Sequence, residues 1–109
     1  MTDVNDENDE AAVLLRLIGA DPAANDEVLA LVPGTRSASV LTAAALLSRD
    51  PDMLARAAQL ALAPRERQLV ALADAHLHGQ ADLFDGLVRD HLSEHPDHLL
   101  AAWIASRPL

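Results

Sequence analysis

The fold is decided by residues 65–104, RERQLVALADAHLHGQADLFDGLVRDHLSEHPDHLLAAWI. Apolar residues recur in this stretch at intervals of three and four, the spacing that places side chains on one face of an α-helix. Gly79 and Pro96 interrupt the pattern, because glycine readily ends a helix in the left-handed conformation and proline cannot continue one. The stretch therefore predicts three helices joined by short turns.

The same apolar spacing extends through the amino-terminal half, without the period-two alternation typical of a strand. Asp21 and Asp50 each precede a proline, an arrangement that caps and begins a helix, and Gly19 is expected to end the helix before Asp21. Because the links are short, successive helices must be antiparallel. Seven helices are expected, over Glu7–Ile18, Pro22–Val32, Ser37–Ser48, Pro51–Leu62, Arg65–His78, Ala81–Glu94 and Asp97–Ser106.

The breaks between these helices recur with a regular period. Pro33, Pro64 and Pro96 lie 31 and 32 residues apart, and a two-helix repeat of about 30 to 35 residues is typical of an α-solenoid. We expect an all-α fold: a right-handed stack of about three antiparallel helical hairpins plus a carboxyl-terminal closing helix, in one domain over residues 7–109. An irregular helical bundle is the alternative, because alanine and leucine are so frequent that matches at a fixed interval arise by chance.

Residues 65–104 also resemble a known family. A helix that ends at Gly79, a second helix, the Glu94-His95-Pro96 break and a leucine-rich helix follow in the order found in tetratricopeptide repeats, and in particular in the tetratricopeptide repeat 38-like family. Residues 37–63 look like a degenerate repeat of the same kind. The resemblance implies a TPR-like stack that binds a peptide or helix of a partner protein.

Charge and composition exclude several classes of protein. The chain has 109 residues, with 17 acidic and eight basic side chains and a net charge of −9, so the basic surface of a nucleic-acid binder is missing. It has no cysteine, which excludes a disulfide scaffold. The longest uncharged stretch, residues 37–48, is too short to span a membrane, and residues 1–10 are acidic, unlike a signal peptide. We expect a cytoplasmic protein in which residues 1–6 are disordered.

Histidines are the only concentrated reactive groups. His91 and His95 share a helix face and have a spacing that can hold a metal, but a structural role is favoured, because His95 lies where it can bond the free carbonyls of a helix end. His76 and His91 lie in apolar stripes of adjacent helices and are expected to hydrogen-bond to each other in the core. No nucleophile or phosphate-binding motif is present. We therefore expect no catalytic residue, no metal, no cofactor and no enzymatic activity.

The principal functional hypothesis is a protein-binding module. In such a stack the first, third and fifth helices line a concave surface, and the residues expected to contact the partner there are Arg36, Ser39, Ala43, Glu66, Leu69, Ala73 and His76. Trp103 in the closing helix either packs in the core or anchors a partner or a second copy of the chain. The identity of the partner does not follow from the sequence.

A second hypothesis rests on the acidic amino-terminal region. Residues 1–27 have a net charge of −7, which suits a small regulator that occupies a basic site on its target. A solvated acidic surface explains the same residues without any function. The patch comprises Asp3, Asp6, Glu7, Asp9, Glu10, Asp21, Asp26 and Glu27.

Overall fold

The structure, a computed structural model, describes the backbone of residues 6–108, and every regular element in that range is helical. The seven expected helices are confirmed, and each end lies within two residues of its expected position. The expectation of disorder falls on residues 1–5, outside the described range, and on Asp6, which begins the first helix. The helices are α1 (Asp6–Ile18), α2 (Pro22–Leu31), α3 (Ala38–Ser48), α4 (Pro51–Leu60), α5 (Pro64–Leu77), α6 (Ala81–Glu94) and α7 (Leu99–Ala105).

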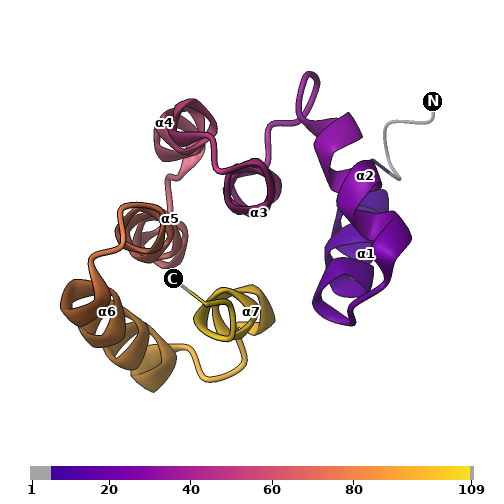
Figure 1. Cartoon of the computed structure of the whole chain (residues 1–109). Coiled ribbons are helices and arrows are strands. Elements are labelled where there is room, and N and C mark those ends of the chain that lie inside the picture. The colour runs from indigo at the N-terminus through magenta and orange to yellow at the C-terminus, as the bar shows by residue number, and fades with distance from the viewer. Residues whose placement is uncertain (1–5, 109) are drawn as a thin grey trace.

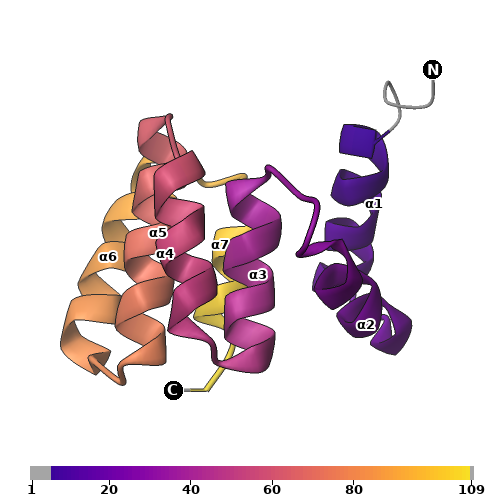
Figure 2. The same cartoon turned by 90° about the horizontal axis from the view of Figure 1, so that it is seen from above.

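The first six helices form three hairpins, α1/α2, α3/α4 and α5/α6, and α7 closes the chain (Figures 1 and 2). Successive hairpins are joined by packing of α2 on α3 and of both α3 and α4 on α5. The all-helical stack of hairpins with a closing helix is thus confirmed. It contrasts with a bundle in which all helices surround one axis, because each hairpin packs mainly on the next.

The three hairpin turns share one backbone motif. Ala20, Arg49 and Gly79 each adopt a positive φ, of 68°, 54° and 65°, and lie 29 and 30 residues apart. The residue after each donates its N–H to a carbonyl five residues back, as in the Schellman helix ending. The turn therefore repeats in structure even where the residue at its centre differs. The expectation that Gly19 takes the left-handed position is wrong, since Ala20 takes it.

The helix starts after these turns follow from local chemistry. Asp21 Oδ1 accepts a hydrogen bond from Ala23 N at 3.0 Å, and Asp50 Oδ1 accepts one from Asp52 N at 2.9 Å. Each aspartate precedes a proline, whose missing N–H costs nothing at the first helical position. The expected capping at α2 and α4 is confirmed.

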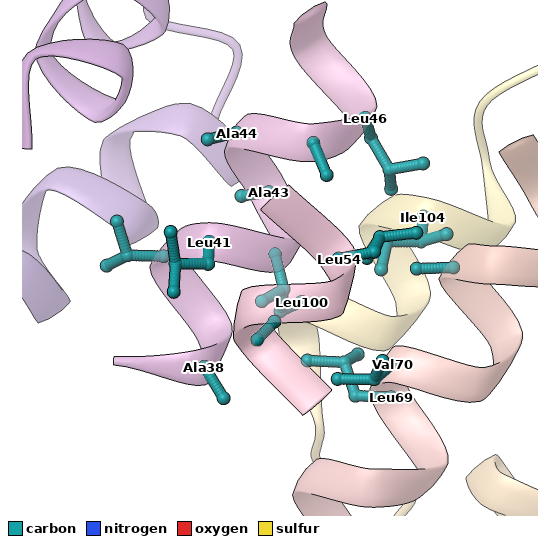
Figure 3. Close-up of a cluster of buried hydrophobic side chains, with 14 of the residues drawn as sticks. Ala38, Leu41, Ala43, Ala44, Leu46, Leu54, Leu69, Val70, Leu100 and Ile104 are labelled. Atoms are coloured by element: carbon teal, nitrogen blue, oxygen red, sulfur yellow. The ribbon is translucent and has the colours of Figure 1, made fainter. Parts of the chain in front are cut away.

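The core is centred on α3, which is buried almost all round because α2, α4 and α5 pack against it. Small alanines on α3 let the neighbouring helices approach closely. Figure 3 shows this core, with side chains of α3, α4, α5 and α7 pointing toward one another. Those labelled are Ala38, Leu41, Ala43, Ala44, Leu46, Leu54, Leu69, Val70, Leu100 and Ile104.

The closing helix lies on the inner side of the arc of α3, α5 and α6, between α6 and α1 (Figure 1). Its side chains Leu100, Ala101 and Ile104 are buried. The inner side of the arc, where the sequence predicts a concave surface for a partner, is therefore occupied by the last helix of the chain itself.

The apolar stripe of α1 is rotated from the one predicted. Val13 and Leu17 are buried, whereas Ala11 and Leu15, assigned to the buried face from their spacing, are exposed, Leu15 by 56%. Helical spacing is compatible with either set of residues in this leucine-rich segment. In the structure α1 packs against α2, α7 and α3, and Val13 and Leu17 are the side chains that become buried.

Arg56 of α4 fixes the connection between the first two hairpins. Its guanidinium donates to the carbonyl oxygens of Val32 at 2.6 Å and of Thr35 at 2.8 Å. Both acceptors belong to the link between α2 and α3, which has no regular structure of its own. One side chain thus holds the link against the second hairpin.

Candidate functional site

Three of the residues expected to contact a partner lie together at the surface. Arg36, Ser39 and Glu66 line a groove of about 410 Å³ formed by α1, the start of α3 and the start of α5. We call it the Arg36 groove. Its other lining residues are Glu10, Ala11, Leu14 and Ser37.

Local capping places the side chains of α3 at the groove. Ser37 is the N-cap of α3, and its Oγ accepts a hydrogen bond from Val40 N at 3.2 Å. Thr35 Oγ1 accepts a hydrogen bond from Ser37 N at 3.1 Å. This bond spans Arg36 and fixes the backbone on both sides of it. Arg36 is therefore held just before the helix, with its side chain exposed, and Ser39 lies in the first turn.

Glu66 serves the fold as well as the groove. Its Oε1 accepts hydrogen bonds from the backbone N–H groups of Leu62 at 3.3 Å and Ala63 at 3.2 Å, just before α5. This contact satisfies donors that a helix start leaves unpaired. Replacing Glu66 would change stability together with the groove, so Arg36 and Ser39 are the better positions for testing binding.

The groove offers both signs of charge above an apolar base. Arg36 supplies a guanidinium, Glu10 and Glu66 supply carboxylates, and Ala11 and Leu14 supply apolar contact. Such a surface can pair with backbone and side-chain groups of a polypeptide.

The other four residues expected on the third and fifth helices are buried and cannot line an open surface. Ala43, Leu69 and Ala73 are fully buried, and His76 is 2% exposed. Ala43 and Leu69 belong to the core shown in Figure 3, and the ring of His76 packs against that of Phe84. The expectation that these four side chains contact a partner is therefore corrected, because the packing of α3 and α5 against their neighbouring helices buries them.

His76 is held in the core by the carboxyl-terminal segment. Its Nε2 lies 3.3 Å from the carbonyl oxygen of Arg107 and must donate, because a carbonyl can only accept. Its ring meets the ring of Phe84 edge-on at 5.2 Å. Its Nδ1 is buried without a hydrogen-bond partner among the described residues. His76 therefore does not bond to His91, and that expectation is wrong.

Trp103 is half-buried on α7. The guanidinium carbon of Arg107 lies 4.7 Å from the centre of its ring, a cation–π geometry. Trp103 thus belongs partly to the core and partly to the surface, and its expected role as an anchor for a partner stays a prediction.

A chain of hydrogen bonds that runs from the surface into the core joins α5, α6 and the start of α7. Gln68 donates through Nε2 to Glu94 Oε1 at 3.3 Å and accepts through Oε1 from His91 Nδ1 at 2.7 Å. His91 Nε2 must then accept, and it does so from His98 Nδ1 at 2.6 Å. Because His98 is the N-cap of α7, this chain attaches the closing helix to the third hairpin.

The surroundings favour the neutral form of both imidazoles by lowering the pKa of each. Burial lowers the pKa of His91, and the neighbouring His95 and Arg65 lower it further. Burial also lowers the pKa of His98, to about 4, with Arg65 acting in the same direction. The lowered pKa values are consistent with a hydrogen bond between two neutral imidazoles, in which His98 is the donor and His91 is the acceptor. Among residues 9–108, no three histidine, aspartate or glutamate side chains are grouped so as to hold a metal ion.

The acidic patch is only partly described. Asp3 lies outside the described residues, and so do the side chains of Asp6 and Glu7. Glu27 pairs with both terminal nitrogens of Arg16, one of them at 2.8 Å, and Asp21 caps α2. Asp9 and Asp26 are exposed. Of the five acids of the patch whose side chains the structure describes, Asp21 and Glu27 thus have structural partners, and the regulator hypothesis stays a prediction.

No family model matches this chain, and comparisons with curated proteins and with solved structures find no match either. The likeness to tetratricopeptide repeats therefore stays a prediction about ancestry. Across the described part of the chain, no helix has the length and apolar character needed to cross a membrane.

Proposed function

We propose that this protein is a non-catalytic protein–protein interaction module that binds a peptide or helix of a partner protein in the Arg36 groove. The observation that carries the proposal is the meeting of Arg36, Ser39 and Glu66, from two different hairpins, at one surface groove. Binding at a groove between packed helices needs no movement of the core.

The charges of the groove specify the chemistry of the partner. Arg36 favours a carboxylate at one place, and Glu10 and Glu66 favour a basic side chain at another. Leu14 and Ala11 favour an apolar residue between them. The proposed ligand is thus a short amphipathic segment that carries both an acidic and a basic residue.

Site-specific photo-crosslinking tests the proposal. A photoreactive amino acid at Ser39 is expected to capture a protein from the native cell extract, and Arg36→Glu in the same chain is expected to abolish the capture. The matched control places the same amino acid at Ser93, an exposed serine of α6, where no such product is expected. Equal products at both positions, or capture that Arg36→Glu does not change, would contradict binding in this groove.

A further inference from the structure

A second groove lies between α4 and α5, with a volume of about 450 Å³. The residues of α4 that line it are uncharged, among them Leu54, Ala55 and Ala58. We call it the α4–α5 groove. It shares no lining residue with the Arg36 groove.

The residues that α5 contributes to this groove form one helical stripe with opposite charges at its ends. They are Arg67, Val70, Ala71 and Asp74, at positions i, i+3, i+4 and i+7, which share a helix face. Arg67 and Asp74 are exposed, and the two central residues are apolar. The stripe therefore has a cation at its amino-terminal end and an anion at its carboxyl-terminal end.

Such a stripe is complementary to itself in the antiparallel direction. A two-fold axis perpendicular to α5, passing between Val70 and Ala71, brings Arg67 of each copy to Asp74 of the other. A two-fold interface requires this relation, in which residue i meets residue j and residue j meets residue i. The small side chains of Ala58 and Ala71 leave room for a second helix to approach.

We propose that two copies of this chain associate through the α4–α5 groove, with α5 of each copy lying antiparallel in the groove of the other. The charge complementarity selects a second copy, since both charges of the stripe are paired by the same contact. Within one copy their contacts are weak surface ones. Arg67 donates to the carbonyl oxygen of Leu62 at 2.9 Å, and Asp74 lies 3.3 Å from Nδ1 of the exposed His78.

The first test is the oligomeric state. Sedimentation equilibrium is expected to show a dimer for the unmodified chain at micromolar concentration. Ala71→Arg is expected to give a monomer with unchanged helical content, since residue 71 is exposed and arginine favours helix. The matched control is Ala102→Arg at an exposed alanine of α7, which is expected to remain dimeric. An unmodified chain that is monomeric up to millimolar concentration overturns the proposal, as does a dimer that only the Ala102 variant dissociates.

Charge reversal tests the geometry itself. Arg67→Glu alone and Asp74→Arg alone each place like charges together twice, and each is expected to weaken the dimer by about tenfold or more. A mixture of the two single variants is expected to form a heterodimer, because every facing pair is then of opposite sign. Failure of the mixture to associate more tightly than either variant alone contradicts the antiparallel arrangement.

Discussion

Arg56 is only half-buried, but its two hydrogen bonds to backbone carbonyls make it important for the stability of the link between α2 and α3. The link that it holds contains Thr35, which is buried, and precedes the α3 start that supplies Arg36 and Ser39 to the groove. Hydrogen bonds from a charged donor contribute about 1.5 to 3 kcal/mol each. The position of the groove residues thus depends on a side chain that is 20 residues away from Arg36 in sequence.

Arg56→Ala is expected to lower the free energy of unfolding by about 2 to 4 kcal/mol, because two carbonyl oxygens lose a charged donor. Urea denaturation followed by circular dichroism measures this change. Arg89→Ala, at an exposed arginine of α6, is the control and is expected to change stability by less than about 0.5 kcal/mol. Equal effects of the two substitutions would show that the contacts of Arg56 do not hold the link.

The histidine pair predicts a dependence of stability on pH. The pKa of His98 is about 4 in the folded chain and 6.5 ordinarily, so the unfolded chain binds more protons between these values. The free energy of unfolding therefore falls as the pH falls from 6.5 toward about 4, and this contribution levels off below. His98→Asn introduces a side chain that does not titrate and that is well suited to the N-cap position, and it is expected to flatten the dependence in this window. An unchanged slope in urea titrations across that pH range would contradict the assignment.

At the scale of the helices, the shared turn motif has an energetic consequence. Ala20 holds a left-handed conformation that glycine adopts more easily. Ala20→Gly is therefore expected to raise the free energy of unfolding by about 0.5 to 1 kcal/mol. Ala23→Gly, in the first turn of α2, is the control and is expected to lower it by a similar amount. Destabilisation by both glycines in thermal denaturation would argue against the positive φ at Ala20.

The packing of α7 is tested at Ile104, whose side chain is fully buried. Ile104→Ala is expected to cost about 2 to 4 kcal/mol, the usual range for removing a buried branched side chain. Leu99→Ala removes a similar side chain from the same helix, but residue 99 is 53% exposed, so we expect a cost below about 1 kcal/mol. Chemical denaturation compares the two. Similar small costs would mean that α7 does not fill the inner side of the stack.

Sequence reasoning succeeded for elements that local chemistry determines. The aspartate-proline pairs fixed the starts of α2 and α4, and Pro96 separated α6 from α7. It failed where the outcome depends on distant segments. The spacing in α1 could not distinguish the face of Val13 from that of Leu15, and nothing near Trp103 specifies that α7 turns to the inner side.

The same limit applies to the candidate site. Arg36, Ser39 and Glu66 were expected on one surface formed by the third and fifth helices, and they do line one groove, while their role in binding stays a prediction. Ala43 and His76 were expected at the surface, but contacts with segments distant in sequence bury them, such as the contact of His76 with the carbonyl oxygen of Arg107. The role of Arg56 carries no local signal, since its acceptors are backbone carbonyls in a link without a sequence pattern.

The whole molecule is a short stack of hairpins that covers its inner side with its own last helix. A longer solenoid can offer its concave face to a ligand, but in this chain α7 packs on the corresponding face, which therefore forms part of the hydrophobic core. Binding surfaces are therefore expected at the grooves between helices on the outside. The Arg36 groove and the α4–α5 groove share no lining residue, so we expect that a partner and a second copy can be held at the same time.

The most direct test of the proposed function is the affinity for the partner captured at Ser39, measured by isothermal titration calorimetry. Arg36→Glu is expected to weaken binding by about tenfold or more, because it reverses the one cation of the groove. Arg89→Glu makes the same change on α6, away from the groove, and is expected to leave the affinity unchanged. Equal affinities of the two variants would contradict binding in the Arg36 groove.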